Sequence, residues 1–347
     1  MKRALLATLL LTSCAQTEVV RLNGAGASFP FPLYSKYFYE YARLRNVQVN
    51  YQSIGSGAGQ RQTVARVIHF GASDGPMKDS ALEKIPGYPE NTILHVPTAL
   101  GAVVPIYNLE GISGTLRFNG PLLADIYLGK VQKWNDPALK ALNPGVKLPD
   151  RPINVVHRSD GSGTSFVFTD YLSKVSPEWA EKVGSGTAVN WPTGIGGRGN
   201  EGVTAIVQQA EGSIGYVESV YADQNDMTYG AIQNRAGNFI KADPASVTAA
   251  AAAVEVPEDT RVSITDSPAP QGYPLASYTW MLAYKDLEGN MTRQEAQAVR
   301  DLLEWVVTGG QQYNARLGYA PLPAQTVERA RAQIARLTYG GEPLTGR

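Results

Sequence analysis

The chain has 347 residues, more than one hydrophobic core comfortably supports, so its length predicts two lobes. Hydrophobic residues make up 43%, an ordinary share for a globular protein, and basic and acidic residues number 31 each, which gives a formal net charge of zero. This balance excludes the basic field that attracts nucleic acid over a distance, so any anion has to be held by local geometry.

Residues 1–13 are predicted to be an export signal, because two basic residues precede an apolar run, Ala4 to Leu11, that is too short to span a bilayer. The run leads to Leu-Thr-Ser-Cys, which resembles a bacterial lipobox. Cys14 is the only cysteine, which excludes a disulfide within the chain. We expect Cys14 to be lipidated, residues 14–17 to form a short tether, and the protein to be held outside the cytoplasm, in the periplasm or at the cell surface. Plain secretion with an incidental cysteine is the alternative.

Strands and helices alternate after this segment. The pattern predicts strands at 18–26, 47–55 and 69–74, helices at 28–44 and 60–68, and a glycine-rich turn at 56–59. Such alternation is typical of parallel βαβ units. Ligands of open parallel sheets bind at the carboxyl ends of the strands, where helix N-termini gather.

The same design recurs in "RPINVVHRSDGSGTSFVFTDYLSKV", which predicts a strand from Ile153 to Val156 and a helix from about Thr164 to Val175. The turn between them carries Ser162 and Thr164, whose hydroxyls can donate hydrogen bonds, and glycines that expose backbone N–H groups. Together with the positive end of the helix dipole, these groups predict an anion cradle.

Two charged residues complete this turn. Arg158 supplies a planar, permanently charged guanidinium suited to tetrahedral oxyanions, and Asp160 can orient it through a salt bridge. The alternative is an ordinary helix whose N-cap is Asp160 or Ser162.

The earlier turns repeat the pattern, since Ser28, the backbone of Phe29 and Ser56 lie at two further helix N-termini. Asp74 is the exception, because a carboxylate repels an anion. It is compatible with a ligand that carries a proton: hydrogen phosphate can donate to Asp74, whereas sulfate cannot and would leave a buried carboxylate unpaired. The alternative is a turn-forming aspartate before Gly75.

Several segments resemble the phosphate-binding protein of the bacterial high-affinity phosphate ABC importer, across nearly the whole mature chain. They are "LNGAGASFPFPLY", "VNYQSIGSGAGQRQ", "FGASDGPM", "DIYLGKVQKWNDP", "RSDGSGTSFVFTDYL", "NWPTGIGGRGNEGV" and "GSIGYVE". The resemblance implies phosphate contacts from Ser28, the Phe29 backbone, Ser56, Asp74, Arg158, Asp160, Ser162, Gly163 and Thr164. One departure is Ser28, where many relatives have threonine, but the hydroxyl is retained.

The resemblance also implies the fold: an α/β, two-lobed periplasmic-binding-protein type II fold, each lobe a mixed sheet flanked by helices, with the ligand in the cleft between the lobes. On this sequence, residues 18–105 and 278–347 would form the first lobe and 107–271 the second, with hinge crossings near 106–109 and 272–277. Closure on phosphate would precede delivery to the permease of an ABC importer. We expect a monomer without a cofactor.

An enzyme is the main alternative, since a phosphomonoester hydrolase also needs Arg, Ser and a helix N-terminus. His69, His95 and His157 are far apart in sequence, and no HxH or DxH pattern indicates a metal site. The glycine-rich segment "GTAVNWPTGIGGRGNEGV" lacks the Lys-Ser/Thr pair of a P-loop, and its glycines predict a surface turn before the helix "NEGVTAIVQQA". The sequence therefore predicts binding without catalytic or metal-ligating residues, and the full set of donors disfavours a scaffold without a ligand.

Overall fold

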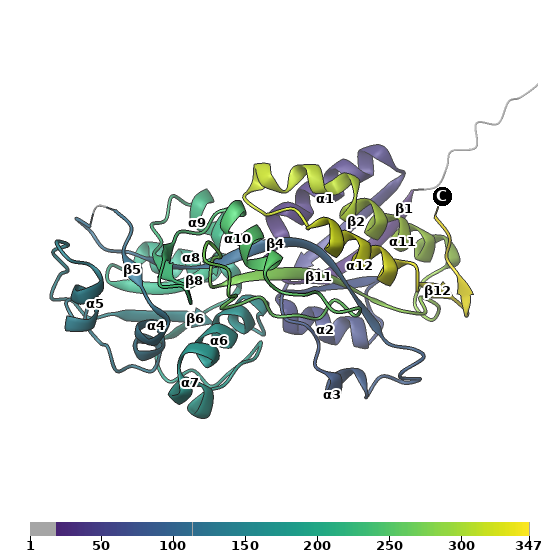
Figure 1. The fold of residues 1–347 in the computed structure, drawn as a ribbon. Coiled ribbons are helices and arrows are strands. Elements are labelled where there is room, and N and C mark those ends of the chain that lie inside the picture. Colours follow the sequence, from purple (N-terminus) through teal and green to yellow (C-terminus); the bar gives the residue numbers. More distant parts are fainter. Residues whose placement is uncertain (1–18, 113, 347) are drawn as a thin grey trace, which may run out of the picture.

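The computed structural model describes residues 19–112 and 114–346, so the predicted signal at 1–13 and the predicted lipidation site Cys14 lie outside the described residues. An eight-stranded mixed sheet runs the length of the molecule in the order β2-β1-β3-β11-β4-β8-β6-β7 (Figure 1). Its strands are β1 (Val20–Gly26), β2 (Val47–Ser53), β3 (Phe70–Ser73), β4 (Ile93–Tyr107), β6 (Asn154–Arg158), β7 (Ile195–Gly197), β8 (Ser213–Glu218) and β11 (Ala276–Tyr284).

Helices cover this sheet, and two small sheets accompany it. The helices are α1 (Phe31–Leu44), α2 (Ser56–Val64), α3 (Asp79–Leu82), α4 (Gly120–Tyr127), α5 (Pro137–Leu142), α6 (Gly163–Val175), α7 (Pro177–Lys182), α8 (Gly199–Gln209), α9 (Ser219–Gln224), α10 (Pro244–Ala252), α11 (Arg293–Val307) and α12 (Ala324–Ile334), with short 3-10 helices at Gly309–Tyr313 and Ala315–Leu317. The small sheets contain β5 (Arg117–Phe118), β9 (Ala231–Gln233) and β10 (Phe239–Ile240), and β12 (Thr338–Tyr339) with β13 (Glu342–Pro343).

The first lobe is built on β2, β1 and β3, which are parallel, with β11 antiparallel beside them. The predicted alternation of strand and helix is confirmed here. The predicted turn at 56–59 is wrong, because these residues form the first turn of α2. A Cβ atom on Gly59 would lie 2.6 Å from the Cα of Gly26, so the glycine allows α2 to begin directly against β1.

The second lobe contains β8, β6 and β7, in which β6 pairs in parallel with both neighbours. The prediction of a surface turn in the glycine-rich segment is corrected, because Ile195–Gly197 forms the edge strand β7. Its glycines permit close backbone packing, since a Cβ atom on Gly197 would lie 2.7 Å from the backbone nitrogen of Val203 in α8. The predicted helices at 164–175 and after the glycine-rich segment are confirmed as α6 and α8.

Strand β4 joins the lobes, so that their two mixed sheets are continuous. Ala102 pairs with Ala276 of β11, whereas the next residue, Val103, pairs with Glu218 of β8. All 15 residues of β4 are buried, which is typical of a strand covered on both faces. The change of partner lies a few residues before the predicted crossing at 106–109, and the predicted lobe boundaries stay a prediction.

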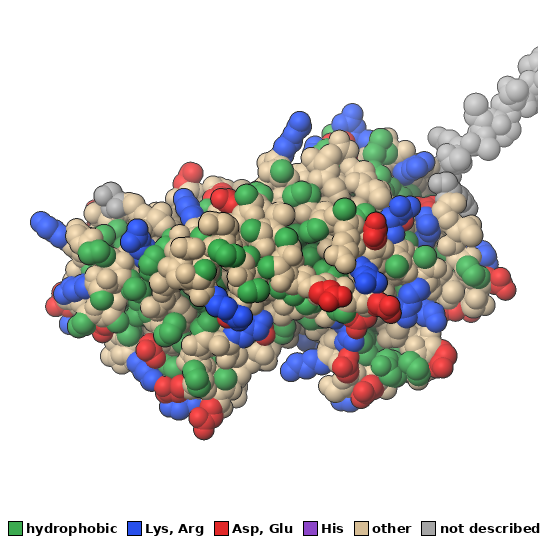
Figure 2. Space-filling view, in the orientation of Figure 1, with side chains coloured by type: hydrophobic (Ala, Val, Ile, Leu, Met, Phe, Trp, Pro, Cys, Tyr) green, Lys and Arg blue, Asp and Glu red, His purple; other side chains and the backbone are tan. Residues whose placement is uncertain are grey.

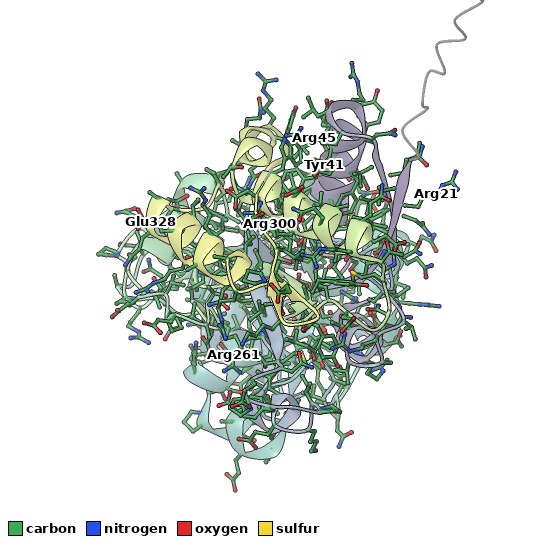
Figure 3. The ribbon with its side chains drawn as sticks, turned by 90° about the vertical axis from the view of Figure 1, so that its right-hand side faces the viewer. Arg21, Tyr41, Arg45, Arg261, Arg300 and Glu328 are labelled. Atoms are coloured by element: carbon green, nitrogen blue, oxygen red, sulfur yellow. The ribbon has the colours of Figure 1, made fainter. Side chains whose placement is uncertain are left out.

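The C-terminal helices return to the first lobe and lie beside its N-terminal elements (Figure 3). Trp305 of α11 packs against Tyr41 of α1, with 5.2 Å between ring centroids. Basic and acidic side chains are interspersed over the surface, and a notch separates the lobes at one edge (Figure 2). Within the described part of the chain, each helix falls short of the length or apolarity needed to cross a bilayer.

Candidate functional site

Three connections of the first lobe bring polar groups to one edge of the sheet. Ser28 and Phe29 follow β1, Ser56 begins α2 after β2, and Asp74 follows β3. Because these strands are parallel neighbours, their carboxyl ends meet at the same edge. Ser28, Ser56 and Asp74 are each at most 2% exposed, so their polar groups face the protein interior and not bulk water.

The second lobe contributes the end of β6 and the start of α6. Ser162 is the N-cap of α6, and its hydroxyl accepts a hydrogen bond of 3.0 Å from the backbone N–H of Ser165. The alternative interpretation, a helix capped by Ser162, therefore describes the role of this hydroxyl correctly. Within the described residues, however, no protein group accepts the backbone N–H groups of Gly163 and Thr164, nor that of Phe29 in the first lobe. These N–H groups are available to an anion.

Arg158 and Asp160 form the predicted ion pair, with Nε donating to Oδ1 at 2.8 Å and Nη2 to Oδ2 at 2.6 Å. Burial alone would raise the pKa of Asp160, but the hydrogen bonds from Arg158 and from the Gly199 N–H hold it below its ordinary value. The remaining nitrogen, Nη1, donates to Thr164 Oγ1 at 3.3 Å. The guanidinium is thus fixed as a charged group at the start of α6.

Asp74 is the acidic group of the site. Burial raises its pKa to about 7, an effect that hydrogen bonds from Thr279 and Ser56 and the charge of Arg158 only partly offset. Thr279 Oγ1 donates to Oδ1 at 2.8 Å, and Ser56 Oγ donates to Oδ2 at 3.4 Å. A carboxyl that titrates near neutrality can exist in either protonation state at physiological pH, so it can accept or donate a proton.

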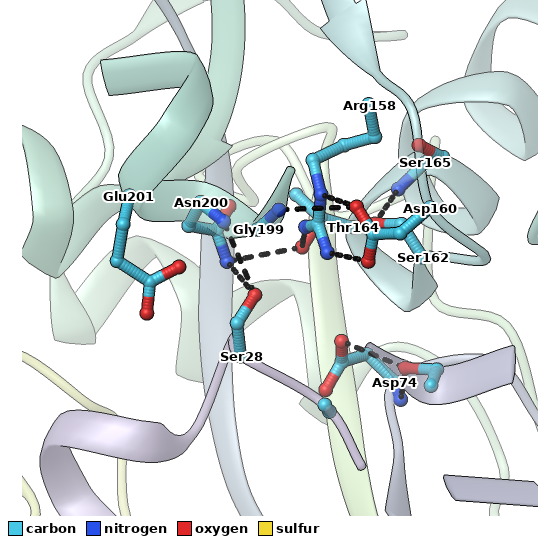
Figure 4. Close-up of polar contacts among 12 residues, drawn as sticks. Ser28, Asp74, Arg158, Asp160, Ser162, Thr164, Ser165, Gly199, Asn200 and Glu201 are labelled. Atoms are coloured by element: carbon cyan, nitrogen blue, oxygen red, sulfur yellow. Dashed lines mark hydrogen bonds and ion pairs between the residues drawn. The ribbon is translucent and has the colours of Figure 1, made fainter. Parts of the chain in front are cut away.

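The two sets of groups lie together because the lobes touch directly (Figure 4). The backbone N–H of Gly57 donates to the carbonyl of Gly161 at 2.8 Å, and Tyr221 Oη donates to the carbonyl of Ser28 at 2.6 Å. Asn200, at the start of α8, donates to Ser28 Oγ from both its backbone and its side chain. The structure is therefore a closed state in which both lobes surround the same groups.

All nine residues that the sequence indicated as ligands lie at this junction, in the positions just described. The sequence analysis missed Asn200, Thr279 and Tyr221. Asn200 follows a glycine-rich segment at the start of a helix, and that pattern was a usable signal. No such signal exists for Thr279 and Tyr221. Thr279 reaches the site through the pairing of β11 in the sheet, and Tyr221 reaches it from α9.

The histidines lie outside this arrangement. His157 stacks on Trp191, with 4.9 Å between ring centroids, and Ser162 bonds to the backbone of its own helix instead of to His157. His95 accepts the Met77 N–H, and His69 accepts the Asn23 N–H. The described residues contain no cluster of three or more His, Cys, Asp or Glu that could hold a metal ion. The site thus combines many donors with a single carboxyl that titrates near neutrality, a set suited to a protonated oxyanion.

Comparisons with known proteins show which family the chain belongs to. A family model described as the PBP superfamily domain matches residues 12–309. The phosphate-binding protein PstS of Pasteurella multocida is 44% identical over 336 residues, covering 96% of this chain and 95% of that protein. That of Xylella fastidiosa (strain Temecula1) is 46% identical, covering 93% and 87%.

Solved structures share the fold at low identity. A putative phosphate ABC transporter substrate-binding protein from Clostridium perfringens, with bound phosphate, gives a TM-score of 0.63 at 18% identity, covering 87% of this chain and 100% of that one. The phosphate-binding protein of Stenotrophomonas maltophilia gives 0.67 at 17% identity, covering 90% and 93%. The chain therefore belongs to the PBP superfamily and, within it, to the PstS family of phosphate-binding proteins.

Proposed function

We propose that this protein binds inorganic phosphate as hydrogen phosphate between its lobes and delivers it to the permease of an ABC importer. The observation that carries the proposal is the junction itself: donors from both lobes lie around Asp74, a buried carboxyl that is not paired with arginine. The names of the relatives, which are phosphate-binding proteins, support the same ligand.

The residues divide the task of binding. Ser28, Ser56, Ser162 and Thr164 supply hydroxyls, while Phe29, Gly163 and Thr164 supply backbone N–H groups. Arg158 supplies charge and Asp160 orients it. In its ionised form Asp74 accepts the proton of the ligand, so that only a protonated tetrahedral anion satisfies every group.

Closure of the lobes follows from this division. Because the groups come from both lobes, only an anion that touches both of them favours the closed state, by its differential affinity for that state. Ser162 Oγ accepts the backbone N–H of Ser165 as the cap of α6, so its place in the site is explained by binding, and an assay with a phosphate monoester tests for hydrolysis.

The ligand is tested by isothermal titration of residues 15–347 after bound phosphate has been removed by unfolding and refolding. We expect phosphate and arsenate to bind with micromolar or tighter dissociation constants, corresponding to about −8 kcal/mol or better, and sulfate not to bind. Equal binding of sulfate, or no binding of phosphate, would overturn the proposal. A parallel assay with a generic phosphate monoester distinguishes binding from hydrolysis, because turnover would indicate an enzyme.

We also propose that Cys14 is lipidated and tethers the protein outside the cytoplasm. The sequence Leu-Thr-Ser-Cys after a short apolar run supports this step. Full-length protein expressed in a bacterium with a lipoprotein pathway should fractionate with membranes, whereas Cys14→Ser should not. Intact-mass measurement of the membrane form should show acyl chains on a chain that begins at residue 14. An unmodified cysteine would contradict the anchor but not phosphate binding.

A further inference from the structure

Asn200 is fully buried between the lobes, and every polar atom of its side chain is engaged. Its Oδ1 accepts the backbone N–H of Glu218 at 3.2 Å. Its Nδ2 donates to Ser28 Oγ at 3.0 Å and to Thr164 Oγ1 at 3.3 Å. Asn200 thereby connects a hydroxyl of the first lobe with a hydroxyl of the second (Figure 4).

These contacts fix the orientation of the amide. A backbone N–H only donates, so the atom facing Glu218 must be the oxygen of the Asn200 side chain. The nitrogen then faces the two hydroxyls, and it has one hydrogen for each of them. A flipped amide would place the nitrogen against the Glu218 N–H, lose that bond, and turn toward the two hydroxyls an oxygen that can only accept.

The amide in turn determines what the hydroxyls can do. A hydroxyl has one proton and two acceptor sites. Ser28 Oγ accepts two bonds, from the backbone N–H and the Nδ2 of Asn200. Thr164 Oγ1 also accepts two, from Asn200 Nδ2 and Arg158 Nη1. With the acceptor sites filled, each hydroxyl is left with its proton to donate.

We propose that Asn200 is a positioning residue that commits the hydroxyls of Ser28 and Thr164 to donate to phosphate and connects the lobes in the closed state. This inference rests on the proposed function, because it assumes that the two protons are directed at the anion. Asn200 itself donates to the hydroxyls and not to the ligand. Its contribution to affinity therefore depends on the presence of those hydroxyls.

The decisive experiment is a double-mutant cycle read out by phosphate titration. We expect Asn200→Ala to weaken phosphate binding about 10-fold, since two hydroxyls lose their fixed orientation. In a Ser28→Ala background the same substitution should cost clearly less, and likewise in a Thr164→Val background. If the loss of phosphate affinity in each double variant equals the product of the two single losses, Asn200 acts only through the fold. That result would overturn the proposal.

Asn200→Asp is the sharper variant, because an aspartate has nearly the same shape. Its oxygens would accept the protons of Ser28 and Thr164 and reverse both hydroxyls, so we expect at least about a 100-fold loss of phosphate affinity. Folding should persist, because acidic residues are favourable in the first turn of a helix. Near wild-type affinity for Asn200→Asp would contradict the proposal.

Asn143→Ala is the matched control. Asn143 is also a buried amide, but within the described part of the chain its side chain bonds to backbone groups of Arg117 and Leu139, both in the second lobe. The Asn143→Ala variant should have a lower melting temperature than wild type, and its phosphate affinity should stay within about twofold of the wild-type value. A wild-type protein that does not bind phosphate would refute the proposed function, whereas phosphate binding with multiplicative losses would refute only the role of Asn200.

Discussion

Gly163, the first residue of α6, faces Asp74 across the junction of the lobes so closely that a Cβ atom on it would lie 2.5 Å from Asp74 Oδ2. The same atom would lie 2.4 Å from Ser56 Oγ. The glycine therefore allows the N-terminus of α6 to reach the carboxyl ends of the first-lobe strands. This approach requires the absence of a side chain and not an unusual backbone, because the φ angle of Gly163 is not positive.

Gly163→Ala should separate affinity from stability. The added methyl group would hold the lobes apart, so we expect phosphate affinity to fall at least about 10-fold. The melting temperature of the phosphate-free protein should stay unchanged or rise, since alanine is the better helix former. Titration calorimetry and thermal unfolding measure the two effects. Ser173→Ala near the other end of α6 is the control and should leave phosphate affinity unchanged. Unchanged affinity for Gly163→Ala would show that phosphate binding does not require the close contact between the start of α6 and Asp74.

Asp74→Asn should relax the rejection of sulfate. The asparagine amide can donate to an oxygen that carries no proton, whereas the Asp74 carboxylate can only accept. We expect the ratio of phosphate to sulfate affinity to fall by at least about 100-fold, mainly through gained sulfate binding. Competition titrations with both anions measure this ratio. Continued exclusion of sulfate by the variant would show that another group selects the protonated ligand.

Asp74 should also make the stability of the closed state depend on pH when no phosphate is bound. Burial raises its pKa to about 7, so the folded state binds this proton more tightly than the unfolded state does. The free energy of unfolding should therefore fall as the pH rises from about 4 to about 7, by up to about 4 kcal/mol from this group. Asp74→Asn removes this contribution. Urea unfolding at pH 5.5 and 8 should show the variant gaining stability relative to wild type at the higher pH, and a constant difference would contradict the raised pKa.

Sequence predicts the parts of this site that depend on local pattern. Ser56 and Asp74 each follow a strand, and parallel strands end at one edge, so their proximity follows from the order of elements. The Arg158–Asp160 pair spans two residues of one turn and was equally accessible. The contact of Thr279 with Asp74 joins residues 205 positions apart through the register of β11 and β3, which no local pattern encodes. The same holds for Asn200, whose role depends on both lobes.

Arg158→Lys should show that shape matters as well as charge. Lysine keeps the positive charge but cannot donate to both oxygens of Asp160 and to Thr164 in one plane. We expect phosphate affinity to fall about 10-fold to 100-fold, and further for Arg158→Ala, with the fold retained. Circular dichroism checks the fold and titration the affinity. Arg151→Ala, which removes an exposed partner of Glu211 in the same lobe, is the control and should leave affinity unchanged.

Tyr221→Phe should loosen the closed state without removing a proposed phosphate ligand. Tyr221 Oη donates to the carbonyl of Ser28 at 2.6 Å, and this bond holds the second lobe against the first. Its loss should favour the open state by about 1 kcal/mol and so raise the phosphate dissociation rate about fivefold. The association rate should change little, because capture begins from the open state.

Stopped-flow measurements of intrinsic tryptophan fluorescence separate these two rates. Tyr107→Phe is the matched control, because the partners of Tyr107 Oη among the described residues are the backbone groups of Gly114 and Leu116, on its own side of the junction. That variant should keep the dissociation rate of the wild type. Slower association with unchanged dissociation for Tyr221→Phe would contradict this prediction. It would show that the bond between Tyr221 and Ser28 already forms when phosphate binds, and that it does not hold the lobes closed afterwards.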